Sequence, residues 1–388
     1  MNRVWRCIRL SLVGIACGAV APLMAEELDA PAPAAPHYEV DTSWPKLPLP
    51  NNWAIGELGG IFVDERDHVW IVHRPGTLFP WERGAAMTPP RSSCCFPAPP
   101  VIEFNPEGEV VGAWGGPGDG YDWPTVEHGI TVDHNGDVWI GGSSTREGRN
   151  GEPPDGMVLK FSADGEFLMQ IGGSGPSKGS LDVSQLSGAS DMVIDPETNE
   201  VFIADGYGNN RVIVFDASTG AFKRQWGAYG KPPTDEELPA YNPDAEPANQ
   251  FRTAHCITLS KDDFIYVCDR DNNRIQIFTT QGEFRDEYRY GLKTLPPGTV
   301  GHVSLSPDEN ERILAVTDLG NFQVRLVRRS DGEQLSVFGH FGHYAGQLNR
   351  VHQAVFNSHG DIFTAEAAGK RIQRWKKSSS KPDGASVE

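Results

Sequence analysis

The amino-acid sequence predicts an all-β protein built as a six-bladed β-propeller. One unit, made of an apolar strand, a polar turn and a second apolar strand, occurs six times between residues 60 and 364. The 388 residues include 43 Gly and 30 Pro, and no long stretch has helical periodicity, which favours short strands joined by tight turns. Two further strand-like segments follow each unit, so that each blade has four strands.

The copies follow one another at intervals of 46 to 70 residues, at residues 60–72, 130–140, 192–203, 257–267, 303–315 and 354–364. Turns such as Asn135-Gly136 suit hairpins. The last copy has only about three strands before Trp375, so residues 37–41 are expected to supply its fourth strand and to close the ring. A β-sandwich or several small β domains would be the alternative, which the likeness and spacing of the copies disfavour.

Segments outside the repeats divide the chain further. Three arginines precede an apolar run at residues 10–21, and Ala25 follows, so residues 1–25 are typical of a cleavable secretory signal. The run is too short for a membrane span, and a secreted or periplasmic location is expected. Lipidation at Cys17 is the less favoured alternative, because Gly14 stands where a lipoprotein signal has a large aliphatic residue.

The expected domain boundaries follow from these segments. Residues 26–36 form a Pro/Ala linker, residues 37–376 the propeller and residues 377–388 a disordered tail. Two inserts interrupt the repeats, a Pro-rich one at residues 75–99 and a polar one at residues 228–250. Long loops on a rigid scaffold often line a functional site.

Charge and cysteine content limit the partners. The formal net charge is −18, and it becomes −21 if residues 1–25 are removed, which argues against nucleic-acid or anionic-membrane binding. A monomer is expected. The remaining cysteines could form disulfides in an oxidising compartment, but their pairing stays open: Cys94, Cys95, Cys256 and Cys268.

Three histidines hold the same position in the second, fourth and sixth copies: His128, His255 and His352. Equivalent positions of the innermost strands surround the central channel of a propeller, so the three imidazoles are expected to meet at its axis. Small residues hold this position in the other copies: Gly59, Ser190 and Gly301. Three imidazoles with an open fourth position form the usual frame of a catalytic zinc, although copper, nickel or iron fit the same frame. The alternative is three unrelated histidines in a polar channel wall.

A second set of polar residues follows the second strand of the blades. Carboxylates recur there at matching positions and are interpreted as structural, together with Arg211 and Arg274: Asp205, Asp269, Asp318 and Glu366. Arg74, Tyr207 and Arg270 break the repeat. A tyrosine near cations and a metal can act as a base, and guanidinium groups suit a carboxylate-bearing substrate.

These motifs resemble the peptidyl-α-hydroxyglycine α-amidating lyase family within the NHL-repeat propellers. The resemblance runs from about Tyr38 to Trp375, and its most specific pieces lie at residues 72–74, 127–133, 205–211, 254–255 and 269–276. It implies that His128, His255 and His352 bind zinc and that Tyr207, Arg74 and Arg270 are catalytic. The implied reaction splits an N-acyl hemiaminal, from a small molecule or a peptide that carries a carboxylate, into an amide and glyoxylate.

The sequence departs from the family pattern at three positions. The resemblance implies a structural Ca²⁺ as well, but Gln353 stands where the family has the aspartate that serves it. Arg350 replaces a methionine near the third histidine, and Gly208 replaces a cysteine beside the tyrosine. A zinc-dependent lyase is the leading hypothesis. A metal-dependent hydrolase such as a lactonase, and a non-catalytic propeller that binds a protein or glycan, stay open as alternatives.

Overall fold

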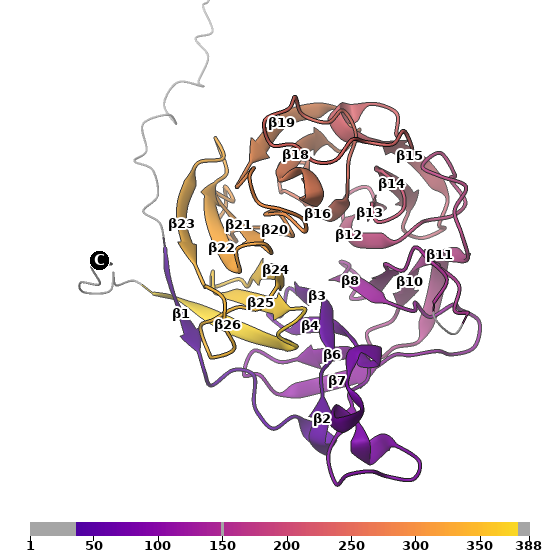
Figure 1. Cartoon of the computed structure of the whole chain (residues 1–388), viewed down its shortest axis with the longest axis vertical. Coiled ribbons are helices and arrows are strands. Elements are labelled where there is room, and N and C mark those ends of the chain that lie inside the picture. Colours follow the sequence, from indigo (N-terminus) through magenta and orange to yellow (C-terminus); the bar gives the residue numbers. More distant parts are fainter. Residues whose placement is uncertain (1–35, 149–150, 379–388) are drawn as a thin grey trace, which may run out of the picture. The chain divides into compact units, whose positions relative to one another are not determined.

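The computed structural model describes residues 36–148 and 151–378. The predicted signal segment, most of the linker and residues 379–388 of the tail lie outside these residues. The described chain forms a ring of six four-stranded antiparallel sheets, which confirms the predicted propeller (Figure 1). Among the described residues, no helix is long and apolar enough to cross a membrane.

The blades follow one another along the chain, each running from the channel outwards. Blades 1 to 3 are β3 (Glu57–Val63), β4 (Val69–Arg74), β6 (Val101–Phe104) and β7 (Val110–Trp114); β8 (Glu127–Val132), β9 (Val138–Gly142), β10 (Asp155–Phe161) and β11 (Phe167–Ser174); and β12 (Ala189–Asp195), β13 (Glu200–Asp205), β14 (Arg211–Asp216) and β15 (Phe222–Trp226). Blades 4 and 5 are β16 (Ala254–Leu259), β17 (Phe264–Asp269), β18 (Arg274–Thr279) and β19 (Phe284–Arg289); and β20 (Val303–Leu305), β21 (Ile313–Asp318), β22 (Gln323–Arg328) and β23 (Gln334–Phe338).

Blade 6 joins the two ends of the described chain. It contains β24 (Val351–Phe356), β25 (Ile362–Glu366), β26 (Arg371–Ser378) and, as its outer strand, β1 (His37–Asp41). The predicted closure by residues 37–41 is therefore confirmed. The predicted boundary at residue 376 is two residues short, because Lys377 and Ser378 pair with Tyr38 and His37 and so continue the closing strand.

The hydrophobic core lies between the blades rather than at the centre of the ring. Each of six buried clusters combines residues from two neighbouring blades, as where Trp139 of blade 2 packs with Ile203 and Ile213 of blade 3. This follows from strand geometry, because alternate side chains of a strand point to opposite faces of its sheet, and each face meets the next blade. The channel lining is left free to carry polar groups.

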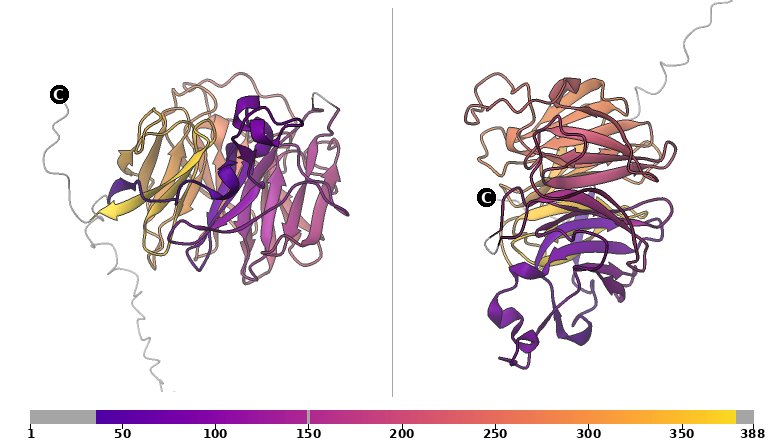
Figure 2. Two further views of the ribbon diagram at one scale, coloured as in Figure 1. Left: turned by 90° about the horizontal axis from the view of Figure 1, so that it is seen from below. Right: turned by 90° about the vertical axis from the view of Figure 1, so that its right-hand side faces the viewer.

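Both inserts lie on the same face of the ring. Successive strands of a blade are antiparallel, so the connections between second and third strands and those between blades leave one face, which we call the insert face. The insert between β4 and β6 contains η2 (Pro75–Thr77), η3 (Pro80–Glu82), η4 (Gly84–Ala86) and β5 (Phe96–Pro97), which pairs with β2 (Trp53–Ala54). Figure 2 shows its short helical turns projecting beyond the strands.

The cysteines pair locally. Cys256 and Cys268 are joined by a disulfide that links β16 to β17, where they lie opposite each other in the ladder. Cys94 and Cys95 in the first insert are joined to each other. These two pairings resolve the alternatives that the spacing left open.

The repeated carboxylates, which were interpreted as structural, are partners of arginines. Each accepts a hydrogen bond from an arginine on the neighbouring strand, in the pairs Asp205–Arg211, Asp269–Arg274, Asp318–Arg325 and Glu366–Arg371. In blade 3, Asp205 also accepts hydrogen bonds from the Ser187 backbone and from Asn209. The loop that carries Tyr207 is therefore fixed at both ends by one buried carboxylate.

Replacing Arg211 by methionine should lower the free energy of unfolding by about 3–5 kcal/mol, because it leaves the buried Asp205 carboxylate without its cation. Urea unfolding followed by tryptophan fluorescence measures the change. The exposed Arg312 pairs with Asp308, and Arg312→Met should cost less than about 1 kcal/mol. Equal losses in the two variants would contradict the structural role given to the buried pair.

Candidate metal centre

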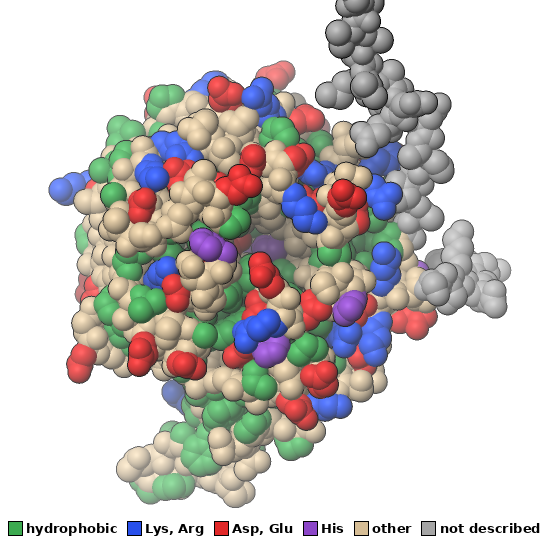
Figure 3. Space-filling view, turned by 180° about the vertical axis from the view of Figure 1, so that it is seen from behind, with side chains coloured by type: hydrophobic (Ala, Val, Ile, Leu, Met, Phe, Trp, Pro, Cys, Tyr) green, Lys and Arg blue, Asp and Glu red, His purple; other side chains and the backbone are tan. Residues whose placement is uncertain are grey.

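Three innermost strands bring the predicted histidines together at the axis of the ring. His128 lies in β8, His255 in β16 and His352 in β24, and all three are buried. Their ring centroids are 4.7, 5.0 and 5.1 Å apart, which is close to threefold symmetry. One nitrogen from each ring lies within 4.8 Å of the others, so the three imidazoles can hold one metal ion. The ring is hollowed at its centre in the space-filling view (Figure 3).

The backbone of the next blade orients two of these imidazoles. His128 Nδ1 donates to the carbonyl of Ser190, and His255 Nδ1 donates to the carbonyl of Gly301, each at 2.6 Å. Ser190 and Gly301 hold the histidine position in their own blades, so the small residues of the alternating pattern supply the acceptors. A carbonyl only accepts, so both Nδ1 atoms carry the proton and both Nε2 atoms present a lone pair to the axis.

Tyr207 reaches the same point from the loop between β13 and β14. Its Oη lies 2.9 Å from Nε2 of His128 and 2.9 Å from Nε2 of His255. A phenol has one proton, so it can satisfy only one of these two lone pairs. His352 Nδ1 is buried without a hydrogen-bond partner in the described chain. The nitrogen lone pairs at this site thus outnumber the protons available to them, which fits a site for a cation.

Burial keeps the imidazoles neutral, as metal ligands must be. Desolvation holds the pKa of His128, His255 and His352 well below the usual range of histidine. Nearby positive charges add to this effect, including Arg74 and Arg270 at His128. Neutral imidazoles bind a divalent metal without first losing a proton.

The two arginines approach the centre from different blades. Arg270 Nη1 donates to Tyr207 Oη at 3.2 Å, and its Nε is held by Asp271 at 2.9 Å. Burial opposes its charge, but Tyr207 and Asp271 raise the pKa of Arg270 above its ordinary value. Arg74 Nε donates to the backbone carbonyl of Glu127 at 2.9 Å, directly before His128. The Nη2 atoms of both arginines have no protein partner in the described chain, so they can receive an anionic group.

Two acidic residues of this site were not among the sequence predictions. Asp271 positions Arg270, and Glu127 lies beside the metal centre, where Trp123 Nε1 donates to its carboxyl at 3.0 Å. Burial raises the pKa of Glu127 to about 7. The adjacency of Asp271 to Arg270 and of Glu127 to His128 was visible in the sequence. Their contacts depend on the tertiary arrangement.

The residues that directly follow the triad position in the innermost strands form a second ring, which includes Asp191, His302 and Gln353. Gln353 Oε1 accepts a hydrogen bond from the Ile61 backbone at 2.7 Å. The neutral amide oxygen is therefore used to link blades 6 and 1, at the position where a carboxylate would serve Ca²⁺. His302, one residue out of register with the triad, donates from Nδ1 to the Ala354 carbonyl at 3.1 Å and does not join the metal centre.

Asp191 of the second ring makes stability depend on pH. Burial raises the pKa of Asp191 to about 7, above the 3.8 of an unperturbed carboxyl. Between these values the folded state keeps a proton that the unfolded state has lost, so rising pH destabilises the fold. Asp191→Asn does not titrate there. From pH 4 to pH 7 the variant should therefore gain stability relative to wild type, at up to about 1.4 kcal/mol per pH unit.

Urea unfolding of both proteins across this pH range measures the difference. Burial lowers the pKa of His302, whose Nε2 lies 3.9 Å from Asp191 Oδ2, to about 4. Below pH 7 Asp191 is neutral in the folded protein, as asparagine is, so the titration of His302 is a similar background in both proteins. Asp164→Asn, at an exposed turn, is the control and should track the wild type at every pH. A constant difference between Asp191→Asn and wild type from pH 4 to pH 7 would contradict the raised pKa of Asp191.

The chain is similar to known proteins over most of its length. The NHL repeat family matches residues 251–278. A peptidyl-glycine alpha-amidating monooxygenase B from Xenopus laevis is 24% identical over 374 residues, covering 91% of this chain and 37% of the frog protein. The chain therefore spans little more than a third of that relative.

A shorter relative is covered along most of its own length. A probable peptidyl-alpha-hydroxyglycine alpha-amidating lyase from Caenorhabditis elegans is 23% identical, covering 82% of both chains. A solved structure of a Bacteroides thetaiotaomicron protein of unknown function has a TM-score of 0.51 at 14% identity, covering 88% of this chain and 72% of its own. That likeness concerns the fold alone. The resemblance found in the sequence is confirmed: the chain is a β-propeller with a match to the NHL repeat, and most of its length is similar to proteins named as amidating enzymes.

Proposed function

We propose that this protein is a zinc-dependent lyase that cleaves an N-acyl hemiaminal. The substrate R–CO–NH–CH(OH)–COO⁻ would give the amide R–CO–NH₂ and glyoxylate. The observation that carries the proposal is the convergence of three neutral imidazoles, the Tyr207 phenol and the Arg270 guanidinium within hydrogen-bond reach. The relatives named as amidating enzymes support the same reaction.

Different residues of the site would hold the metal and bind the substrate. A zinc ion held by His128, His255 and His352 would supply Lewis acidity that polarises the substrate oxygen. The free Nη2 atoms of Arg74 and Arg270 would bind the carboxylate and orient the carbon that bears the hydroxyl group. Because the site is buried, these charge interactions are stronger than they would be in water.

Tyr207 moves the proton. As a phenolate, stabilised by the 3.2 Å hydrogen bond from Arg270, it takes the proton of the substrate hydroxyl. The new carbonyl of glyoxylate forms as the C–N bond breaks, and the electron pair of that bond goes to nitrogen. Tyr207 then returns the proton to nitrogen, which releases the primary amide. Atoms and charge balance without an oxidant, a reductant or water.

The direct test measures glyoxylate release from N-benzoyl-α-hydroxyglycine by purified, zinc-loaded protein. Release well above the rate without enzyme is expected, with one benzamide formed per glyoxylate. Absence of release from zinc-loaded protein would overturn the lyase proposal. It would favour the reading of the chain as a non-catalytic propeller that binds a protein or glycan.

A further inference from the structure

A cavity of about 660 Å³ opens on the insert face. Its lining includes Gly208 and Asp271, the residues that directly follow Tyr207 and Arg270. Asp271 lines the cavity, and its Oδ1 accepts a hydrogen bond from Arg270 Nε, so it connects the cavity with the metal centre. A substrate whose carboxylate lies at the arginines can therefore extend its acyl group into this space.

The outer wall of the cavity is formed by the insert at residues 228–250. Asp235 fixes one end of this wall by accepting hydrogen bonds from the Ser180 backbone and hydroxyl. Gln250 Nε2 donates to the Glu236 carbonyl at 3.0 Å, and Tyr241 Oη donates to the Leu292 carbonyl at 2.8 Å. These contacts hold the wall in place, so the cavity is formed before any substrate binds.

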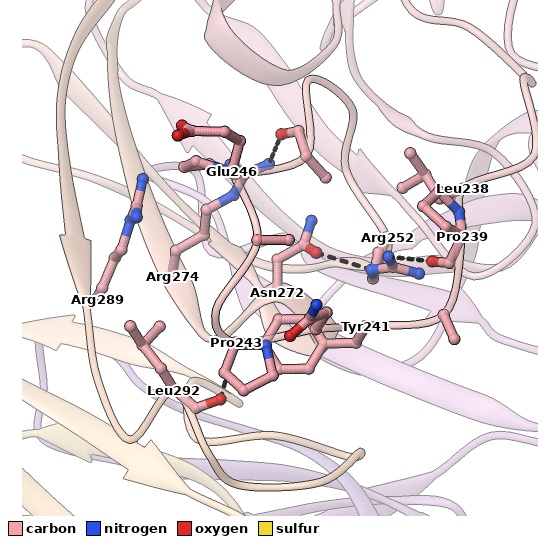
Figure 4. Close-up of a pocket in the computed structure, with 15 residues that line it drawn as sticks. Leu238, Pro239, Tyr241, Pro243, Glu246, Arg252, Asn272, Arg274, Arg289 and Leu292 are labelled. Atoms are coloured by element: carbon pink, nitrogen blue, oxygen red, sulfur yellow. Dashed lines mark hydrogen bonds between the residues drawn. The ribbon is translucent and has the colours of Figure 1, made fainter.

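Arg252 closes the far side of the cavity. It donates to Asn272 Oδ1 at 2.8 Å and to the Pro239 carbonyl, so it is held without a carboxylate partner (Figure 4). With Leu238 and Tyr241 it separates this cavity from a smaller one of about 290 Å³. The large cavity thus has an apolar side at Leu238 and Tyr241 and a polar opening.

The opening of the cavity is acidic. Asp235, Glu236 and Glu237 follow one another along its wall, and all three are exposed. No described cation forms an ion pair with any of them. Among the residues that the structure describes, Arg252 is the only Lys or Arg lining the cavity. The carboxylate-binding end of the site is positive and the opening is negative, so the site favours a substrate with charges of the opposite order.

We propose that this cavity holds the acyl group of the substrate and selects acyl groups that carry a positive charge. The substrate class is then an N-acyl-α-hydroxyglycine whose acyl part ends in an amine or guanidinium group. This inference rests on the proposed lyase function. Glu236 and Glu237 are the specificity residues, and Leu238 and Tyr241 pack against the alkyl chain that leads to the cation.

Three substrates that have the same backbone length and differ in one side chain test the inference: N-acetyl-lysyl-, N-acetyl-methionyl- and N-acetyl-glutamyl-α-hydroxyglycine. The kcat/KM of the wild type should be about five-fold higher for the lysyl than for the methionyl substrate, and lowest for the glutamyl one. The preference should shrink in about 0.5 M salt, because the charges at the opening are exposed. The double variant Glu236→Gln/Glu237→Gln should bring the three values together.

A matched control removes the same charge from the other face. Glu107 and Glu166 are exposed in turns between third and fourth strands, so Glu107→Gln/Glu166→Gln should keep the wild-type preference. A 6-aminohexanoyl substrate separates two sources of the cation. If its kcat/KM equals that of the lysyl substrate, the cavity accepts cationic acyl groups in general. If its kcat/KM is lower, the cavity is specific for basic peptides.

The outcomes distinguish the two proposals. Glyoxylate release from all three substrates with equal kcat/KM would overturn the charge selection and leave the lyase function standing. A preference that survives in the Glu236→Gln/Glu237→Gln variant, or is lost equally in the control, would also overturn it. No release from any substrate would overturn the lyase function and this inference with it.

Discussion

His128→Ala is expected to abolish metal binding and, with it, all glyoxylate release. The three imidazoles present their lone pairs to one point, and two remaining ligands cannot hold zinc against dialysis. Metal analysis should find about one zinc per wild-type chain and less than about a tenth of that in the variant. The fold should persist, because the hydrophobic clusters lie between the blades and not at the axis.

The control for this experiment is His302→Asn. His302 is also buried and lies one residue out of register, and an asparagine amide can replace Nδ1 as donor to the Ala354 carbonyl. This variant should keep its zinc and its activity. Equal zinc in the wild type and His128→Ala would refute the metal centre, and loss of zinc from both variants would place the metal elsewhere.

Tyr207→Phe is expected to lower kcat by about 100-fold to 10,000-fold with zinc content unchanged. The substitution removes the one oxygen that lies within hydrogen-bond reach of two ligands and Arg270, but it leaves both arginines to bind the carboxylate. KM should therefore change much less than kcat. Steady-state kinetics of glyoxylate release, with metal analysis of the same samples, separates the two effects.

Tyr121→Phe is the matched control, because that hydroxyl donates to the Gly116 carbonyl and not to a residue of the metal centre. Its kinetics should equal those of the wild type. A Tyr207→Phe variant that retains kcat within about ten-fold of the wild type would remove the tyrosine from the proton transfer. The base would then have to be sought among other groups beside the centre, such as Glu127.

Much of the fold could be predicted because every blade of a propeller repeats the same sequence pattern. Each blade needs the same alternation of strand and turn, so six copies report one architecture. The histidines could be placed at the axis for the same reason, because residues at the same position of different blades lie at the same distance from the axis of the ring. The buried Asp205–Arg211 and Asp269–Arg274 pairs were also predictable, because they recur at the same place in successive blades.

The contacts within the site could not be predicted in this way. The hydrogen bonds of His128 and His255 to the next blade depend on the approach of two backbones, which the register does not reveal. The contact of the Asp271 carboxylate with Arg270 depends on side-chain direction, and the contact of Arg74 with the Glu127 backbone carbonyl depends on where the Arg74 side chain reaches. The pairing of Cys256 with Cys268 follows from their opposite positions in the β16–β17 ladder, which the spacing alone left undecided.

The sequence repeat was therefore sufficient to predict the ring of blades, its closure by residues 37–41, and the convergence of His128, His255 and His352, because all three follow from periodicity. Only the folded arrangement decided where Tyr207 Oη lies, which nitrogen of His128 and of His255 faces the axis, and how the insert at residues 228–250 forms the wall of a cavity. Such features come from single loops and side chains that occur once in the chain. A contact that occurs once has no equivalent in the other blades from which its geometry could be inferred.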